Sequence, residues 1–103
     1  MRLTADEPVG IVRLPAEGPV PVALSLKVAP SGGPLSIEAW IEGPGRPALR
    51  LGAIAPYPAG QAGEFLLGWP AKLGALPPPA HVRLVLKPAA PGAKATVTAA
   101  WRQ

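Results

Sequence analysis

The stretch Val20-Pro21-Val22-Ala23-Leu24-Ser25-Leu26-Lys27-Val28 decides the fold. Valine and leucine occupy every second position in it, and Pro, Ala, Ser and Lys occupy the positions between. Alternation with a period of two predicts a β-strand with one buried face. Because proline lacks an amide hydrogen, Pro21 indicates that the strand lies at an edge or begins near this residue.

The same alternation recurs along the chain, in short runs separated by turns that are rich in proline and glycine. Proline breaks helix interiors and central strands, so the runs between prolines are too short for ordinary helices but fit strands. Residues 71–75 leave room for one helical turn. The further predicted strands are Leu35–Glu42, Glu64–Trp69, His81–Lys87 and Lys94–Arg102, with a shorter one at Leu49–Leu51 and a weaker one at Val9–Leu14.

About seven short strands without a convincing amphipathic helix predict an all-β protein, an antiparallel sandwich. We expect an immunoglobulin-like arrangement first, with a jelly roll or a small barrel as the second choice. The chain has no cysteine, so the disulfide of antibody domains cannot form. The connector at residues 88–93 is rich in Pro, Ala and Gly, which predicts a hairpin that places Lys87 opposite Lys94.

Length and composition indicate a single domain over residues 1–103. The hydrophobic fraction is 49% and only 16% of residues are charged, which favours folding despite 16 prolines and 12 glycines. No signal peptide is visible and no apolar stretch approaches the ~20 residues of a spanning helix, so we expect a cytoplasmic or virion protein that does not enter a membrane. The absence of Asn fits either a thermostable protein or a GC-rich genome.

Few side chains in the sequence could carry out catalysis. His81 is the only histidine and Asp6 the only aspartate, and no serine lies in a nucleophile-elbow context. Zinc sites need several His or Cys ligands, and calcium loops need clustered carboxylates. We therefore expect no enzymatic activity, no metal and no cofactor.

Trp40 is the first candidate for binding. It alternates away from the aliphatic face of its strand and stands between Glu38 and Glu42. An outward tryptophan flanked by acids could anchor a protein partner or stack on a sugar ring. The alternative is that the stem of a neighbouring arginine, or a loop, covers the ring.

A basic row on the expected C-terminal hairpin is the second candidate, and a tyrosine held between prolines is the third. Arg83, Lys87, Lys94 and Arg102 would share one face and could meet an acidic protein surface or phosphates. The row has no interleaved aromatic residue, so nucleic acid is not an expected partner. Tyr57 stands between Pro56 and Pro58, whose restricted backbone suits a contact loop. A solvated face and an ordinary connector are the plainer interpretations.

These observations favour a non-catalytic structural or protein-interaction domain that self-associates or joins a larger assembly. In size and class the chain resembles small accessory proteins that decorate viral or phage particles. The alternative is a carbohydrate-binding module that uses an exposed tryptophan, with Trp40 as the first candidate beside Trp69 and Trp101.

Overall fold

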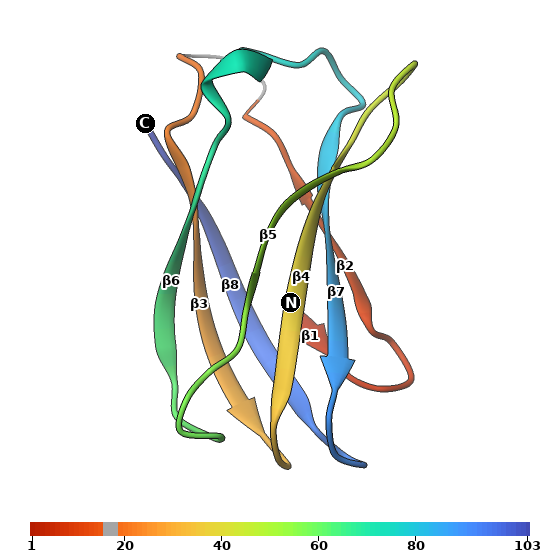
Figure 1. The fold of residues 1–103 in the computed structure, drawn as a ribbon, viewed down its shortest axis with the longest axis vertical. Helices are drawn as coiled ribbons and strands as arrows, with labels where there is room; N and C mark the ends of the chain where they lie inside the picture. Colours follow the sequence, from red (N-terminus) through yellow and green to blue (C-terminus); the bar gives the residue numbers. More distant parts are fainter. Residues whose placement is uncertain (16–18) are drawn as a thin grey trace.

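Two antiparallel four-stranded sheets pack together in the computed structural model, which describes residues 1–15 and 19–103 (Figure 1). The predicted all-β antiparallel sandwich is confirmed. The strands are β1 (Arg2–Leu3), β2 (Val9–Arg13), β3 (Ala23–Ser31), β4 (Leu35–Glu42), β5 (Leu49–Ile54), β6 (Gly63–Gly68), β7 (His81–Pro88) and β8 (Lys94–Arg102).

The strand order is β1-β8-β3-β6 in one sheet and β2-β7-β4-β5 in the other. Every neighbouring pair is antiparallel. The first half of the chain pairs with the second half in reverse order, as β1 with β8, β2 with β7, β3 with β6 and β4 with β5. The chain is thus one long antiparallel ribbon that folds over itself into two layers.

The core lies between the sheets and is made by alternate residues of the strands. Buried and partly exposed residues alternate strictly along β4, and along β7 as far as Leu86. Burying one such aliphatic side chain stabilises the fold by about 1.5–3 kcal/mol. The fully buried side chains include Leu24, Leu26, Ile37, Ile41, Val82, Leu84 and Val97.

The predicted strands are all present, with shifted ends and one addition. The two-residue β1 was not expected, and β3 begins at Ala23 rather than at Val20. Val20 and Val22 were expected inside, but they are 41% and 63% exposed. β3 continues through Pro30 because β6 pairs with β3 only as far as Val28, so the proline interrupts no hydrogen bond on that side.

The predicted hairpin between the last two strands is wrong. β7 lies in one sheet and β8 in the other, so the connector after β7 crosses between the layers. Lys87 is paired with Ser36 and Lys94 with Ser31, so the two lysines are not opposed. In an immunoglobulin-like sandwich the last two strands are neighbours in one sheet, so the strand order does not confirm that version of the fold.

One short helical element and several loops complete the described chain. A 3₁₀ turn at Ala71–Leu73 confirms the expected single helical turn. Within the residues that the structure describes, no helix has the length and apolar character to cross a membrane.

Candidate functional site

The outer face of the β2-β7-β4-β5 sheet brings together five of the eight residues singled out in the sequence. β4 and β7 are paired, and their inward positions are filled by the core, so the alternate residues point outward together. The pairing places Trp40 beside Arg83, Glu38 beside Val85 and Glu42 beside His81. This outer face consists of Val9, Ile11 and Arg13 of β2, His81, Arg83, Val85 and Lys87 of β7, Ser36, Glu38, Trp40 and Glu42 of β4, and Arg50 and Ala53 of β5.

Trp40 lies in the middle of this face and is partly exposed. Its strand neighbours are Arg83 on one side and Arg50 on the other. The indole Nε1 donates a hydrogen bond of 3.4 Å to Oε1 of Glu38. The ring is therefore neither buried nor an open platform, since charged side chains stand on both sides of it.

Glu38 forms ion pairs with two basic side chains near Trp40. Its carboxylate lies 3.8 Å from Nη2 of Arg50 and 4.0 Å from Nζ of Lys87. Ion pairs at a surface contribute about 0–1 kcal/mol each. Their effect here is to fix positions of charge on the face rather than to stabilise the fold.

A second charged group consists of Glu42, His81 and Arg83. One carboxylate oxygen of Glu42 lies 2.9 Å from Nε2 of His81, and the other accepts a hydrogen bond of 3.0 Å from Nε of Arg83. Nδ1 of His81 lies 3.0 Å from the carbonyl oxygen of Pro79. Both ring nitrogens face acceptors, so the geometry favours the doubly protonated imidazolium.

The same contacts shift both pKa values in opposite directions. The carbonyl of Pro79, followed by the side chain of Glu42, raises the pKa of His81 above its usual value. The hydrogen bond from His81, and then the contact with Arg83, lowers the pKa of Glu42, although partial burial opposes this. The group therefore carries a charged carboxylate, a charged guanidinium and a histidine whose proton is held more tightly than usual.

Apolar side chains lie between these charges. Val9 and Ile11 on β2 are 47% and 48% exposed, and the register places them beside Val85 and Arg83. Val85 lies diagonally from Trp40 across the β4–β7 pair, within the reach of an aromatic side chain. The outer face thus combines a strip of apolar side chains with charged side chains around it.

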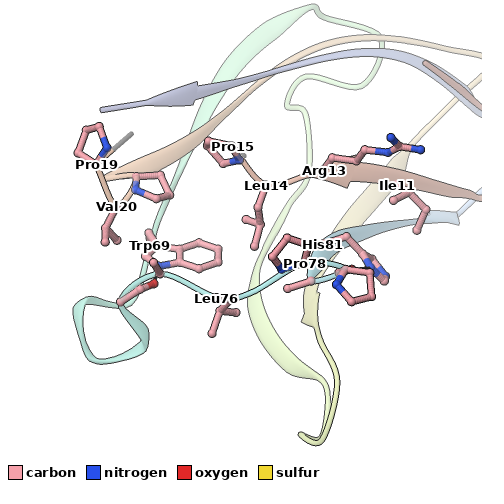
Figure 2. Close-up of a pocket in the computed structure, with 15 residues that line it drawn as sticks. Ile11, Arg13, Leu14, Pro15, Pro19, Val20, Trp69, Leu76, Pro78 and His81 are labelled. Atoms are coloured by element: carbon pink, nitrogen blue, oxygen red, sulfur yellow. Dashed lines mark hydrogen bonds between the residues drawn. The ribbon is translucent and has the colours of Figure 1, made fainter. Parts of the chain in front are cut away.

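A pocket of about 480 Å³ opens at one end of the sandwich. It lies between the segment that follows β2 and the segment that leads into β7. In Figure 2, Leu14, Trp69 and Leu76 lie between Pro19 and Val20 at one end and Ile11, Arg13 and His81 at the other. Ile11, Arg13 and His81 also belong to the outer face, so the pocket and that face are continuous.

Trp69 lines this pocket, and Trp101 packs behind it. Trp69 is buried, and its Nε1 donates a 3.0 Å hydrogen bond to the carbonyl of Gly74. Trp101 packs edge-on against Trp69 with ring centroids 5.6 Å apart. Its own Nε1 donates a 2.9 Å hydrogen bond to the carbonyl of Arg13, which joins β8 of one sheet to β2 of the other.

The remaining candidates lie elsewhere. The expected basic row is wrong, because Arg83 and Lys87 are on β7 whereas Lys94 and Arg102 are on β8 in the opposite sheet. Arg102 is paired with Glu64 at 3.1 Å. Tyr57 is 92% exposed in the connection between β5 and β6, away from the strands of the outer face.

The pocket, like the contributions of β2 and His81 to the outer face, was not predicted from the sequence. The clustering of prolines at positions 15, 19 and 21 and at 77–79 was a usable signal, because five of these six prolines line it: Pro15, Pro19, Pro21, Pro78 and Pro79. Because the backbone of proline is restricted, a pocket lined by prolines loses little conformational entropy on binding.

No group of three or more His, Cys, Asp or Glu side chains in the described part of the chain is placed to hold a metal ion. Comparison with protein-family models, with curated proteins and with solved structures finds no match to this chain.

Proposed function

We propose that this protein is a non-catalytic interaction domain whose partner is another protein. The partner covers the outer face of the β2-β7-β4-β5 sheet and inserts an apolar side chain into the adjoining pocket. The observation that carries the proposal is the continuity of the two through Ile11, Arg13 and His81. Apolar anchors that fill a pocket beside polar contacts dominate the binding energy of many interfaces.

The composition of the outer face supports a protein partner. Interfaces have an apolar centre enriched in aromatic residues and arginine, with a polar rim. Here Val85, Ile11 and the partly exposed Trp40 form the apolar part. Arg50, Glu38 and Lys87 supply charges that can steer a complementary surface.

The topology supports a more specific fold, the jelly roll. A jelly roll is a double-sheet sandwich of eight strands in which the chain wraps as a ribbon, and it occurs in capsid and lectin domains. The pairing of β1 with β8 through β4 with β5 is such a ribbon. Fold alone does not assign function. It is compatible with an accessory or decorating protein of a viral particle or other large assembly.

Site-specific photo-crosslinking tests the proposed surface. A photo-reactive residue at Val85 reports on the outer face, and one at Lys27, whose side chain is 68% exposed on the opposite sheet, serves as the matched control. In extracts of the source cells, we expect one protein to be captured from position 85 and not from position 27. Equal capture from both positions would contradict the proposed surface.

The captured partner, once purified, allows a quantitative test. Trp40→Ala and Leu76→Ser should each raise the Kd by about tenfold or more, which corresponds to about 1.4 kcal/mol. Leu66→Ala, at a 61% exposed position on the other sheet, should leave the Kd unchanged. Titration calorimetry measures all three. If Leu66→Ala weakened binding as much as Trp40→Ala, the assignment to the outer face would be wrong.

A carbohydrate ligand is the second candidate, and the partial exposure of Trp40 between Glu38 and Glu42 favours it. Sugar rings stack on aromatic faces while acids accept bonds from their hydroxyl groups. A glycan array followed by titration of tryptophan fluorescence would identify such a ligand. Binding that persists unchanged in Trp40→Ala would remove this candidate.

A further inference from the structure

We propose that the free edge of β2 pairs with β2 of a second copy of this chain. The two strands run antiparallel about a twofold axis at Ile11, so the β2-β7-β4-β5 sheets of two molecules become one continuous sheet. This goes beyond the proposed function, because it uses the main-chain edge of the sheet rather than its outer face and the pocket.

Hydrogen-bonding groups along β2 are directed away from its own sheet. The amide of Leu86 donates to the carbonyl of Pro8 at 2.8 Å, and hydrogen-bonded pairs alternate along an antiparallel ladder. Gly10 and Val12 therefore bond to β7, whereas Val9, Ile11 and Arg13 point their N–H and C=O groups outward. Among these outward groups, the carbonyl of Arg13 accepts from Trp101 at 2.9 Å.

The other three sheet edges carry features that oppose pairing. β1 has only two residues. The register of β5 shifts between Ala39 and Trp40 of its partner strand, and such a bulge disrupts an edge. On β6, Glu64 stands at the edge in ion pairs with Lys27 and Arg102, and charged edges discourage added strands.

Among the residues that the structure describes, nothing comparable protects the edge of β2 along most of its length. Val9 and Ile11 are about half exposed and apolar, and the strand's one charge is Arg13 at its end. An exposed apolar edge strand is a template for pairing with another chain. The five residues of β2 thus present both the free main-chain groups and the apolar side chains that a second strand would cover.

Self-pairing suits this strand because it ends on the basic Arg13 and is preceded by the acidic Asp6 and Glu7. A twofold axis at Ile11 places Val9 of each copy opposite Arg13 of the other. Beyond Val9, the exposed Asp6 and Glu7 of the second copy lie in the bend just before β2, at the end of the strand that faces Arg13. No like charges are directly opposed in this register.

The same register satisfies the free main-chain groups. The two Ile11 residues exchange N–H···O=C bonds, and the amide of Arg13 donates to the carbonyl of Val9 in the other copy. The amide of Val9 faces the carbonyl of Arg13 in the other copy, which already accepts from Trp101 and offers its second lone pair. Pairing therefore takes nothing from the contacts that hold each copy together.

Proline substitution at the edge tests the proposal directly. The amide of Ile11 faces away from β7, so Ile11→Pro removes no hydrogen bond of the β2–β7 ladder. Leu66→Pro is the matched control, because its amide also points outward, at the edge of β6, and its side chain is 61% exposed. Circular dichroism verifies that both variants fold.

Sedimentation equilibrium over a concentration series measures the mass. We expect the wild-type chain and Leu66→Pro to reach twice the monomer mass as concentration rises, and Ile11→Pro to stay monomeric. Trp40→Ala should dimerise like the wild type, which separates edge pairing from the proposed outer-face function. A wild-type chain that stays monomeric, or an Ile11→Pro chain that dimerises normally, overturns the proposal.

A charge exchange tests the register without proline. Arg13→Glu should weaken dimerisation by about tenfold, since it places acids near Glu7 of the other copy. The double variant E7R/R13E should restore it. If E7R/R13E dimerised no more tightly than Arg13→Glu, the strands would not pair about Ile11.

Discussion

At the scale of single residues, Gly32 occupies a position that other residues cannot take. Its φ is +82°, and a Cβ added there would overlap the main-chain oxygen of Gly92. The turn between β3 and β4 and the turn between β7 and β8 thus touch at this point, at the lower end of the molecule in Figure 1.

Gly32→Ala should therefore destabilise the fold strongly. Gly45→Ala is the control, because its φ is +71° but a Cβ there would meet nothing within 4 Å. The control should cost about 1–2 kcal/mol for the left-handed backbone alone. Gly32→Ala should cost at least about 1–3 kcal/mol more for the overlap. Urea denaturation measures both, and equal losses would show that the two turns do not touch.

His81 should make stability depend on pH. Its pKa is raised in the folded state, so the stabilisation from its proton is complete below the unfolded value of about 6.5 and is lost as the pH rises through the folded pKa. The pKa of Glu42 is lowered, so its contribution is present above its ordinary value and is lost as the pH falls through the folded pKa. Stability should be greatest between these two limits.

The measurement is the Tm of the wild-type chain and of His81→Gln at a series of pH values. The wild-type Tm should fall as the pH rises from about 6.5 through the raised folded pKa of His81, because the stabilisation from its proton is then lost. Glutamine can still reach an acceptor but does not titrate, so the Tm of His81→Gln should be flatter over this range. Parallel curves for the two proteins would contradict the role given to His81.

At the scale of elements, alternation was enough to predict the strands but not how they connect. The strand Leu35–Glu42 was predicted with its observed bounds from the alternation in its sequence. In the structure, each buried residue of this strand is followed by a partly exposed one. The residues between β7 and β8 make a tight turn whether the next strand lies alongside or in the other layer. Turn composition does not distinguish these cases, so the hairpin prediction failed.

Alternation also failed to predict burial just before β3. Val20 and Val22 continue the alternation of β3, but they are exposed, and Val20 lines the pocket. Alternation states which face a side chain shares with its neighbours. It does not state whether anything covers that face at the end of a sandwich.

At this scale, the side chain of Trp101 links the two sheets by a hydrogen bond. Trp101→Phe keeps an aromatic ring beside Trp69 but removes the hydrogen bond from β8 to the carbonyl of Arg13. We expect a loss of about 1 kcal/mol in the free energy of unfolding. Trp40→Phe is the matched change on the outer face, where the indole bond to Glu38 is longer, at 3.4 Å against 2.9 Å, and it should cost less than about 0.5 kcal/mol.

If chemical denaturation gave Trp101→Phe and Trp40→Phe the same stability, the link between β8 and β2 would not contribute to the fold. Hydrogen exchange would locate the effect. The amide groups of β2 should exchange faster in Trp101→Phe, because the end of this strand has then lost its hydrogen bond to the other sheet.

At the scale of the whole molecule, the sequence predicted one group of residues on the outer face but neither the rest of that face nor the pocket. Trp40, Glu38 and Glu42 share a face by parity alone, so their grouping followed from one strand. The pocket joins Leu14 to Trp69 and Leu76, which come much later in the chain. Only the strand order brings these segments together, and that order was not available from periodicity.

The ribbon topology has a consequence for synthesis on the ribosome. β8 lies between β1 and β3, and β7 lies between β2 and β4, so both sheets lack a central strand until the last third of the chain has been made. During translation the alternating segments β3 and β4 emerge with their apolar faces uncovered. Contacts between residues so distant in sequence also form slowly. The nascent chain should therefore depend on shielding by the exit tunnel and by chaperones until translation is nearly finished.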